Sequence, residues 1–460
     1  MSEDKRVSEI ASSADIEKAA GDSPQAAGVS SLKKHINSDD PDEALKLVTG
    51  EVVVLTPEDE KKLLRKIDLN LMPLLCVVYG LNYLDKTTLS YASIMGLRWI
   101  ASVFYFGYLF WEWPTNRLLQ RLPLAKYSAF NVIMWGLTLC CLAAVKDFGG
   151  AMTVRFFLGA FEAAVSPGFA LFTSQWYTKK EQGTRVAWWF SFNGWGQIVG
   201  GCVAYGIAVG TEAHPILIKS WQLVFLVTGF FTAFMGALFL YLMPDSQLNA
   251  RFLTQRERVM AVERIRINQQ GIGNKHFKWS QCKEAFTDPM IWAFVLNSVI
   301  CSIPNGGMSN YFSQLIVSFG FSENESLLLG APGGAVQVIT LLVAGHFGDR
   351  YKSRILFGAG GVLLAKTTAA AMYLVAYCVG NIIGPQVFVS TDAPQYRNAN
   401  IVVLVCMFVS FAILLFIHGW CMYQNKLKAA IRASPGYVKV DGQEFLDLTD
   451  RENPEFIYSL

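Results

Sequence analysis

The sequence carries little charge for its length. Asp, Glu, Lys and Arg make up 16% of the 460 residues, whereas hydrophobic residues make up 52% and the mean hydropathy is +0.32. A soluble globular chain carries about 25% charged residues, so the composition excludes an ordinary soluble protein. Dividing the length by the size of a soluble domain is therefore uninformative. We expect an all-α, polytopic membrane protein.

The sequence also lacks the residue patterns of common enzymes. It contains no nucleophile–base arrangement, no Gly-rich phosphate loop and no cysteine cluster with metal-ligand spacing. Eight of the nine cysteines lie in apolar runs, where a small buried side chain is a simpler interpretation than a disulfide framework. We therefore expect no enzymatic activity, no cofactor, no metal ion and no nucleic-acid partner.

Long apolar runs dominate the chain instead. A helix needs about 20 mostly apolar residues to cross a bilayer, and ten segments meet this requirement. They are residues 71–97, 99–119, 127–146, 151–174, 185–210, 221–243, 289–317, 325–347, 355–388 and 400–423. The ninth is too long for a simple span and is interrupted by Lys366. The chain is therefore predicted to contact the lipid bilayer along most of its length.

Basic residues gather in alternate loops. By the positive-inside rule, this pattern places both termini and the long central loop in the cytoplasm, and we expect the plasma membrane as the location. No signal peptide is evident, and the polar N-terminal segment is expected to be disordered. The predicted parts are a tail (1–60), a six-helix bundle (61–243), a cytoplasmic linker (244–288), a shorter second bundle (289–425) and a second tail (426–460).

The linker contains the stretch TQRERVMAVERIRINQQ, which predicts a helix. Its apolar residues Val259, Val262 and Ile265 recur at helical spacing between charges. We expect an amphipathic cytoplasmic helix that joins the two bundles. A regulatory or lipid-binding helix is the alternative.

A short basic turn follows two even-numbered spans. After the eighth span, GHFGDRYKSR places Gly345, Asp349 and Arg350 in the order G-x-x-x-D-R, and this resembles a loop signature of the major facilitator superfamily. A glycine permits close helix approach, and an Asp with an Arg can join helix ends by charge-assisted hydrogen bonds. The predicted gating residues of the two turns are Asn116, Arg117, Arg121, Gly345, Asp349, Arg350 and Arg354.

Further motifs make the resemblance more specific. LNYLDKTTLSYA, FYFGYLFWEWPTNRLLQRLPLAKY, RFFLGAFEAAVSPGF, WFSFNGWGQIVGG and YCVGNIIGPQVF are similar to the fungal allantoate permease group of the anion:cation symporters, a major facilitator family. The resemblance covers about residues 61 to 425. It implies two six-helix bundles around a central site reached alternately from each side. It also implies import of small organic anions such as allantoate, ureidosuccinate or nicotinate, often with protons, by a carrier expected to be monomeric.

The chain departs from this family in two places. The external loop between the first two spans is clipped to about Gly96 to Arg98. In addition, ILFGAGGVLL, which resembles the start of span nine, runs directly into AKTTAAAMYLVAYCVGNIIGPQVF, which resembles span eleven. We therefore expect about ten spans instead of twelve, with an incomplete second bundle and a C-terminus that can still be cytoplasmic.

An acid and a base lie side by side in the first span. Ionisable residues inside spans are functional candidates by default, and LNYLDKTTLS contains Asp85 and Lys86. Adjacent residues of a helix point about 100° apart, so these two cannot neutralise each other. The resemblance implies an Asp-Arg pair here, and Lys86 keeps the cation without the planar fork. We predict that Lys86 binds the anion, with a structural ion pair to a neighbouring helix as the alternative.

Two further spans supply candidates for proton coupling. Arg155 and Glu162 are seven residues apart and therefore share one face of the fourth span. RFFLG matches the R-x-x-x-G pattern that the superfamily links to proton coupling. We predict that Glu162, or Glu112 in the second span, carries the proton, together with Asp85 and Arg155. The alternative for each Glu is a hydrogen bond that only holds helices together.

Uncharged polar residues in the spans are candidates for the substrate site. Asn193 and Gln197 share a face at i and i+4, although such amides more often join helices than bind ligands. The predicted substrate-binding residues are Asn82, Lys86, Asn193, Gln197, Asn305, Asn310 and Asn381. The fifth span lacks the Gly-Pro pair of superfamily antiporters, which favours symport.

These observations favour a secondary transporter. The predicted function is proton-coupled symport of a small organic anion by alternating access. Two alternatives stay open: a membrane nutrient sensor on a transporter scaffold that does not transport, and an inactive, truncated transporter.

Overall fold

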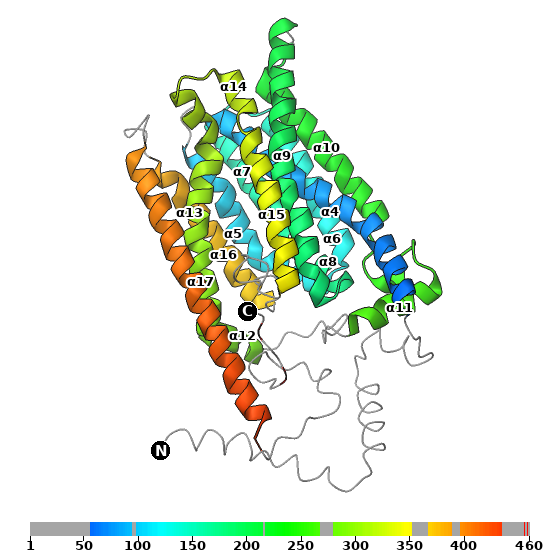
Figure 1. Cartoon of the computed structure of the whole chain (residues 1–460). Helices are drawn as coiled ribbons and strands as arrows, with labels where there is room; N and C mark the ends of the chain where they lie inside the picture. The colour runs from blue at the N-terminus through cyan, green and yellow to red at the C-terminus, as the bar shows by residue number, and fades with distance from the viewer. Residues whose placement is uncertain are drawn as a thin grey trace.

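The computed structural model of the chain describes residues 56–93, 98–214, 217–266, 279–351, 367–388 and 396–434, together with Glu455 and Tyr458. All regular structure in these residues is helical (Figure 1). Helices satisfy every backbone hydrogen bond within one segment, which is what a chain surrounded by lipid requires. The all-α class predicted from the composition is confirmed.

The first bundle follows the predicted order of spans. Its helices are α4 (Pro57–Ser93), α5 (Arg98–Arg121), α6 (Leu124–Leu142), α7 (Phe148–Glu162), α8 (Val165–Trp176), α9 (Lys179–Ala213) and α10 (Ser220–Leu242). Six of the predicted spans correspond to these seven helices, because α7 and α8 together form the fourth span. The predicted short loop between the first two spans, residues 94–97, lies outside the described residues.

The rest of the chain forms the linker and the second bundle. The linker holds η1 (Gln247–Asn249), α11 (Gln255–Arg266) and α12 (Trp279–Thr287). The second bundle comprises α13 (Pro289–Ser318), α14 (Glu323–Leu328), α15 (Ala331–Tyr351), α16 (Thr367–Val387) and α17 (Arg397–Arg432). The junction predicted to lack two spans falls in residues 352–366, outside the described part of the chain.

Each of the ten predicted spans corresponds to a helix or a helix pair. In the described residues, seven helices are long and apolar enough to cross a membrane, and α16 contains a shorter apolar helix. The helices α5 and α9 belong to the first bundle but carry more polar residues than these seven helices. α11 and α12 lie at one end of the bundle, here named the α11 end, and α14 lies at the other, here named the α14 end (Figure 1).

Four helix pairs make the main contacts between the two bundles in the described residues. α9 packs along α15 and also contacts α14, α5 packs against α16, and α4 contacts α13. Glycines allow the closest of these approaches, since a Cβ at Gly194 of α9 would collide with the carbonyl oxygen of Gly334 in α15. Within the first bundle, Gly196 meets the backbone of Gly80 in α4 in the same way. Gly196 thus lets α9 approach α4 closely.

The predicted linker helix is present as α11. Its apolar residues Val262 and Ile265 are buried, and it contacts α4 and α8 of the first bundle. On its polar side, Arg264 is only 2% exposed and binds both Glu60 at the start of α4 and Glu181 in the first turn of α9. Glu181 also caps α9 with Thr178. α11 is therefore fixed to the first bundle through α4 and α9.

Replacing Arg264 by Ala is expected to destabilise the protein. Two carboxylates would lose their common partner, and we expect a loss of roughly 2 kcal/mol, below the roughly 3–5 kcal/mol for a fully buried pair because Glu60 is partly exposed. The measurement is the melting temperature of the detergent-solubilised protein. Arg256→Ala is the matched control, because Arg256 is exposed on the same helix. Equal melting temperatures for the two variants would contradict this role of Arg264.

Candidate functional site

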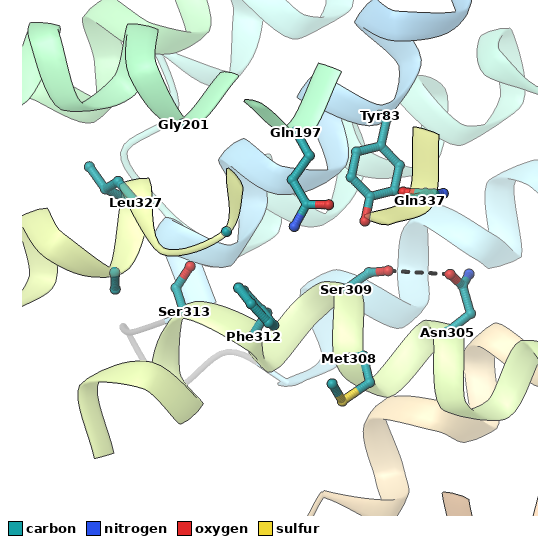
Figure 2. A pocket seen from close by; sticks show the side chains of 12 residues that line it. Tyr83, Gln197, Gly201, Asn305, Met308, Ser309, Phe312, Ser313, Leu327 and Gln337 are labelled. Atoms are coloured by element: carbon teal, nitrogen blue, oxygen red, sulfur yellow. Dashed lines mark hydrogen bonds between the residues drawn. The ribbon is translucent and has the colours of Figure 1, made fainter. Parts of the chain in front are cut away.

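A cavity of about 250 Å³ lies between the two bundles (Figure 2). Its walls come from α4 and α9 of the first bundle and from α13, α14 and α15 of the second. Ser326 and Leu327 of α14 place it toward the α14 end. A volume below the roughly 300–1,000 Å³ of pockets for drug-sized ligands admits only a small molecule.

The lining of this cavity is polar but uncharged. Figure 2 shows the amides of Gln197 and Gln337 and the hydroxyl of Tyr83 facing the space, with Ser309 bonded to Asn305 at 3.5 Å on the opposite wall. None of the 12 lining residues carries a formal charge. The cavity can therefore offer hydrogen bonds in several directions but no counter-ion of its own.

The charge lies next to this cavity, around a smaller space of about 10 Å³. Ser309 borders both spaces, so they adjoin at this residue. The smaller space is lined by Asp85, Lys86, Phe104, Tyr105, Arg155, Ser309 and Asn310. It has room for about one water molecule.

Lys86 and Glu162 form an ion pair beside the smaller space. The Nζ of Lys86 lies 3.0 Å from the Oε1 of Glu162. Asn82, one turn before Lys86, donates to the same Oε1 at 2.7 Å and accepts from Lys86 at 3.1 Å. The ring of Phe104 completes the site, with its centroid 5.9 Å from the ammonium nitrogen. Lys86 therefore forms an ion pair with a residue of a neighbouring helix, as the alternative interpretation predicts. This ion pair does not exclude anion binding by Lys86.

Asp85 takes a different set of neighbours. The indole nitrogen of Trp135 in α6 donates to its Oδ2 at 3.1 Å. The guanidinium of Arg155 in α7 interacts electrostatically with both Asp85 and Glu162. The prediction that Asp85 and Lys86 do not neutralise each other is confirmed, since each finds partners on other helices.

The four charges differ in how far they are accessible. The side chain of Lys86 is 20% exposed, whereas that of Glu162 is fully buried and Asp85 and Arg155 are 1% and 2% exposed. Lys86 is therefore the most exposed of these four side chains. It lines the smaller space together with Asp85 and Arg155, whereas Glu162 is not among the lining residues.

The fourth span has a local irregularity directly after Glu162. α7 ends at Glu162 and α8 begins at Val165, and Ala163 and Ala164 between them keep helical dihedral angles. Pro167 explains the irregularity, because a proline removes the hydrogen bond to the residue four positions earlier and crowds its carbonyl. Glu162 thus directly precedes Ala163, whose carbonyl lacks this hydrogen bond.

Glu112 lies apart from this cluster. It is completely buried on α5, and its Oε1 accepts a hydrogen bond of 2.6 Å from Asn116. Asn116 also donates to the backbone oxygen of Glu112 at 2.9 Å. The side chain of Asn116, which was predicted as part of a gating turn, is therefore turned to Glu112 within the helix.

The predicted amides divide between the cavity and the helix contacts. Gln197 and Asn305 line the larger cavity and Asn310 the smaller one. Asn381 binds Asn305 at 3.0 Å and so joins α16 to α13. Asn193 is buried outside both cavities.

The predicted gating residues are only partly described. Arg117 binds Gln120 at 3.2 Å within α5, and Arg121 lies exposed at its end. Gly345 packs so closely on Ala187 of α9 that a Cβ there would collide with it. The side chains of Asp349 and Arg350, and all of Arg354, lie outside the described residues.

Several residues of the site were not predicted. Trp135 binds Asp85, and Tyr83, Ser309 and Tyr105 line the two cavities. Aromatic and hydroxyl side chains are frequent in all spans, so the sequence holds no signal that separates these from the others. Their proximity to Lys86 arises from the packing of α4, α5, α6 and α13.

Comparisons with known proteins agree with this architecture. Residues 71–416 match the family model of the Major Facilitator Superfamily. An uncharacterised transporter of Schizosaccharomyces pombe is 36% identical and covers 88% of this chain and 91% of its own length. The allantoate permease of Saccharomyces cerevisiae is 35% identical, covering 92% of this chain and 91% of the permease.

The alignment with the S. pombe transporter also shows a deficit in this chain. It extends over 467 positions, although only 88% of the 460 residues take part, which leaves about 60 positions of the relative without a counterpart. Two membrane-spanning helices with their loops have about this length. The placement of the deficit between Leu364 and Lys366 stays a prediction.

A solved structure shares the fold. FucP, a transporter crystallised in the outward conformation, superposes with a TM-score of 0.52 at 13% identity, covering 75% of this chain and 98% of FucP. The two-bundle arrangement, the family match over most of the chain and the two fungal relatives lead to one conclusion. The chain is a multi-pass membrane transporter that belongs to the major facilitator superfamily.

Proposed function

We propose that this transporter imports a small organic anion together with a proton, by alternating access. The observation that carries the proposal is the side chain of Lys86, the most exposed of the four charged side chains, which lines the smaller cavity while its partner Glu162 is fully buried. An anion entering from the larger cavity meets this cation first. Phe104 adds an apolar face beside it for a carbon skeleton.

The balance of charge supports coupling to a proton. Asp85, Lys86, Arg155 and Glu162 sum to zero when all are ionised. An anion bound at Lys86 would leave the buried cluster with one excess negative charge, which is costly at this depth. A proton taken up by Glu162 restores neutrality and frees Lys86 from its carboxylate partner. Anion and proton are thus expected to bind together and leave together.

The uncharged cavity supports a polar substrate. An anion whose carboxylate contacts Lys86 would extend toward Gln197, Gln337 and Asn305, which offer amide donors and acceptors. A site built to hydrogen-bond a substrate discriminates against analogues that leave those groups unpaired. Small carboxylates with further polar groups, such as allantoate or ureidosuccinate, fit this lining better than alkyl carboxylates. Nicotinate is planar and less polar than allantoate, so its expected fit to this lining lies between those of the polar and the alkyl carboxylates.

The orientation of the protein in the membrane follows from its charge pattern. We propose that the α11 end faces the cytoplasm, because the basic residues of α11 lie there and the positive-inside rule assigns such residues to the cytoplasmic side. The larger cavity is then closer to the outer side. We further propose a monomer in the plasma membrane, as the predicted import role requires.

The test is uptake by cells that express only this chain. Radiolabelled allantoate, ureidosuccinate, nicotinate and hexanoate would be compared at external pH 5 and pH 7, with and without a protonophore. We expect at least one polar carboxylate to accumulate faster at pH 5 and to lose accumulation with the protonophore. Equal entry of all four compounds in expressing and empty cells would overturn the proposal for this chain.

A second candidate is a chain that does not transport. The deficit of about 60 positions relative to the S. pombe transporter favours it, because a major facilitator bundle would lack part of its wall. Such a chain would be a nutrient sensor or an inactive product. Transcript sequencing distinguishes a sensor or an inactive product from an error in the coding sequence. Extra codons between Leu364 and Lys366 in the transcript would show that the true protein is longer.

A further inference from the structure

The seam between α5 and α16 joins the two bundles, beginning beside the proposed anion site at Tyr105 and continuing along α5 to Glu112. Tyr377 of α16 packs against Tyr105 and Tyr108 of α5, with ring centroids 6.1 and 6.3 Å apart. One turn beyond Tyr108 on α5 lies Glu112, which interacts electrostatically with the thiol of Cys378 on α16. Glu112 and Cys378 are both 0% exposed. The seam therefore encloses a carboxyl group at a place where the two bundles must separate for access.

Glu112 makes unusually few hydrogen bonds and ion pairs for a buried carboxyl group. Its Oε1 accepts from Asn116, and its Oε2 has no hydrogen-bond partner among the described residues. Among the described residues, no Lys, Arg or His forms an ion pair with the carboxyl group of Glu112. An ionised carboxylate buried without a cation is very costly, whereas its protonated form is not. The closed seam is thus compatible with a proton on Glu112 and incompatible with a bare charge there.

The position of Glu112 separates it from the ion pair of Lys86. Phe104 lies level with Lys86, and Glu112 follows it by eight residues on the same helix toward the α11 end. At 1.5 Å per residue this is about 12 Å. Water that enters when α5 and α16 part at the α11 end would reach Glu112 before it reached Glu162.

We propose that Glu112 is a second proton site, which must be protonated for α5 and α16 to close and which releases its proton to water at the α11 end when they separate. This role is additional to the proposed symport and rests on the same transporter cycle. The proton of Glu112 enters and leaves on one side, so it is not transported. It makes closure of the seam respond to the pH at the α11 end.

The surroundings of Glu112 include other ionisable groups. They are Tyr108 on α5, Tyr377 and Cys378 on α16, Tyr127 on α6, and the Lys86–Glu162 pair of α4 and α7. A phenol and a thiol carry no charge while they are protonated, and the ion pair has no net charge. Glu112 is therefore the group of this set whose ionisation adds a net charge to the seam.

Cys378 allows a direct test without transport. The purified, detergent-solubilised protein would be treated with N-ethylmaleimide between pH 5.5 and pH 8, and modification of each cysteine measured by peptide mass spectrometry. We expect Cys378 to react equally in the wild type and in Glu112→Gln at pH 5.5, and at least tenfold faster in the wild type at pH 8. A carboxylate near a thiol disfavours the thiolate, so its direct effect would have the opposite sign.

Two controls make the result specific. Tyr108→Phe alters the same seam without removing the carboxyl group, and should keep the pH response of Cys378. Cys202, exposed on α9, should react alike in all variants and is the reference for the effect of pH on the reagent itself. If Glu112→Gln is unstable, Glu112→Ala tests the same loss of charge.

The outcomes distinguish this proposal from the proposed function. The same reactivity of Cys378 in wild type and Glu112→Gln at every pH would overturn it, as would a Cys378 that never reacts. Because the assay contains no substrate, a chain that carries no anion can still show the pH-dependent seam. Conversely, transport with an unresponsive Cys378 would retain symport and remove only the role of Glu112.

Discussion

Replacing Lys86 by Gln is expected to abolish anion uptake. The side chain of Lys86 is the most exposed of the four charged side chains in the cluster and lines the smaller cavity, so its loss removes the counter-charge of the substrate. Truncating one partner of a buried, hydrogen-bonded charge pair costs about 2–5 kcal/mol, and each 1.4 kcal/mol is a factor of about ten. We expect initial rates at low substrate concentration to fall by about 100-fold or more, measured with the labelled anion that the substrate panel identifies.

Lys86→Arg is the matched control for this change. Arginine keeps the positive charge, and the resemblance to the allantoate permease group implies an Asp-Arg pair at this place. Its planar fork can bind a carboxylate with two hydrogen bonds. We expect Lys86→Arg to retain uptake within about tenfold of the wild type, with equal amounts of all variants in the membrane by immunoblot.

A double variant separates anion binding from a structural ion pair. If Lys86→Gln fails only because Glu162 is left as an unpaired buried charge, neutralising Glu162 as well should restore the protein. Lys86→Gln/Glu162→Gln would then regain both its melting temperature and its uptake. We expect it to regain stability but not uptake. Recovery of transport in the double variant would return Lys86 to a purely structural role.

The helices could be predicted from the sequence because lipid leaves few alternatives. Within the described residues the predicted spans correspond to helices, since long apolar runs can satisfy their backbone only within a helix. Residues 355–366 of the ninth span lie outside the described part of the chain. The irregularity in the fourth span was not predicted, although Pro167 marks it. Hydropathy averages over about 20 residues and does not register a local irregularity that leaves the span apolar.

The site could be predicted in part, because rare charges in apolar spans must have partners. Asp85, Lys86, Arg155 and Glu162 were all candidates, and the structure brings them into one cluster. The sequence could not show that Lys86 pairs with Glu162, because this contact depends on how α4 packs against α7. It also could not distinguish Gln197, which lines the cavity, from Asn193, which does not. These two share a helix face, and only the position of α15 separates them.

Glu112 and Asn116 show a contact that the spacing of the sequence already contains. In the structure Asn116 lies within α5 and donates to Glu112 one turn earlier. Residues four positions apart on a helix are neighbours, so this contact was available from spacing alone. The role of Asn116 in a gating turn stays a prediction.

Replacing Glu162 by Gln is expected to uncouple anion movement from the proton gradient. Gln has the shape of the protonated acid and can still accept hydrogen bonds from Asn82 and Lys86. The site would then behave as if permanently protonated. We expect exchange of internal labelled anion for external unlabelled anion to persist, while accumulation at external pH 5 falls at least tenfold. Wild-type accumulation and a normal pH profile in Glu162→Gln would exclude this residue as the carrier of the transported proton.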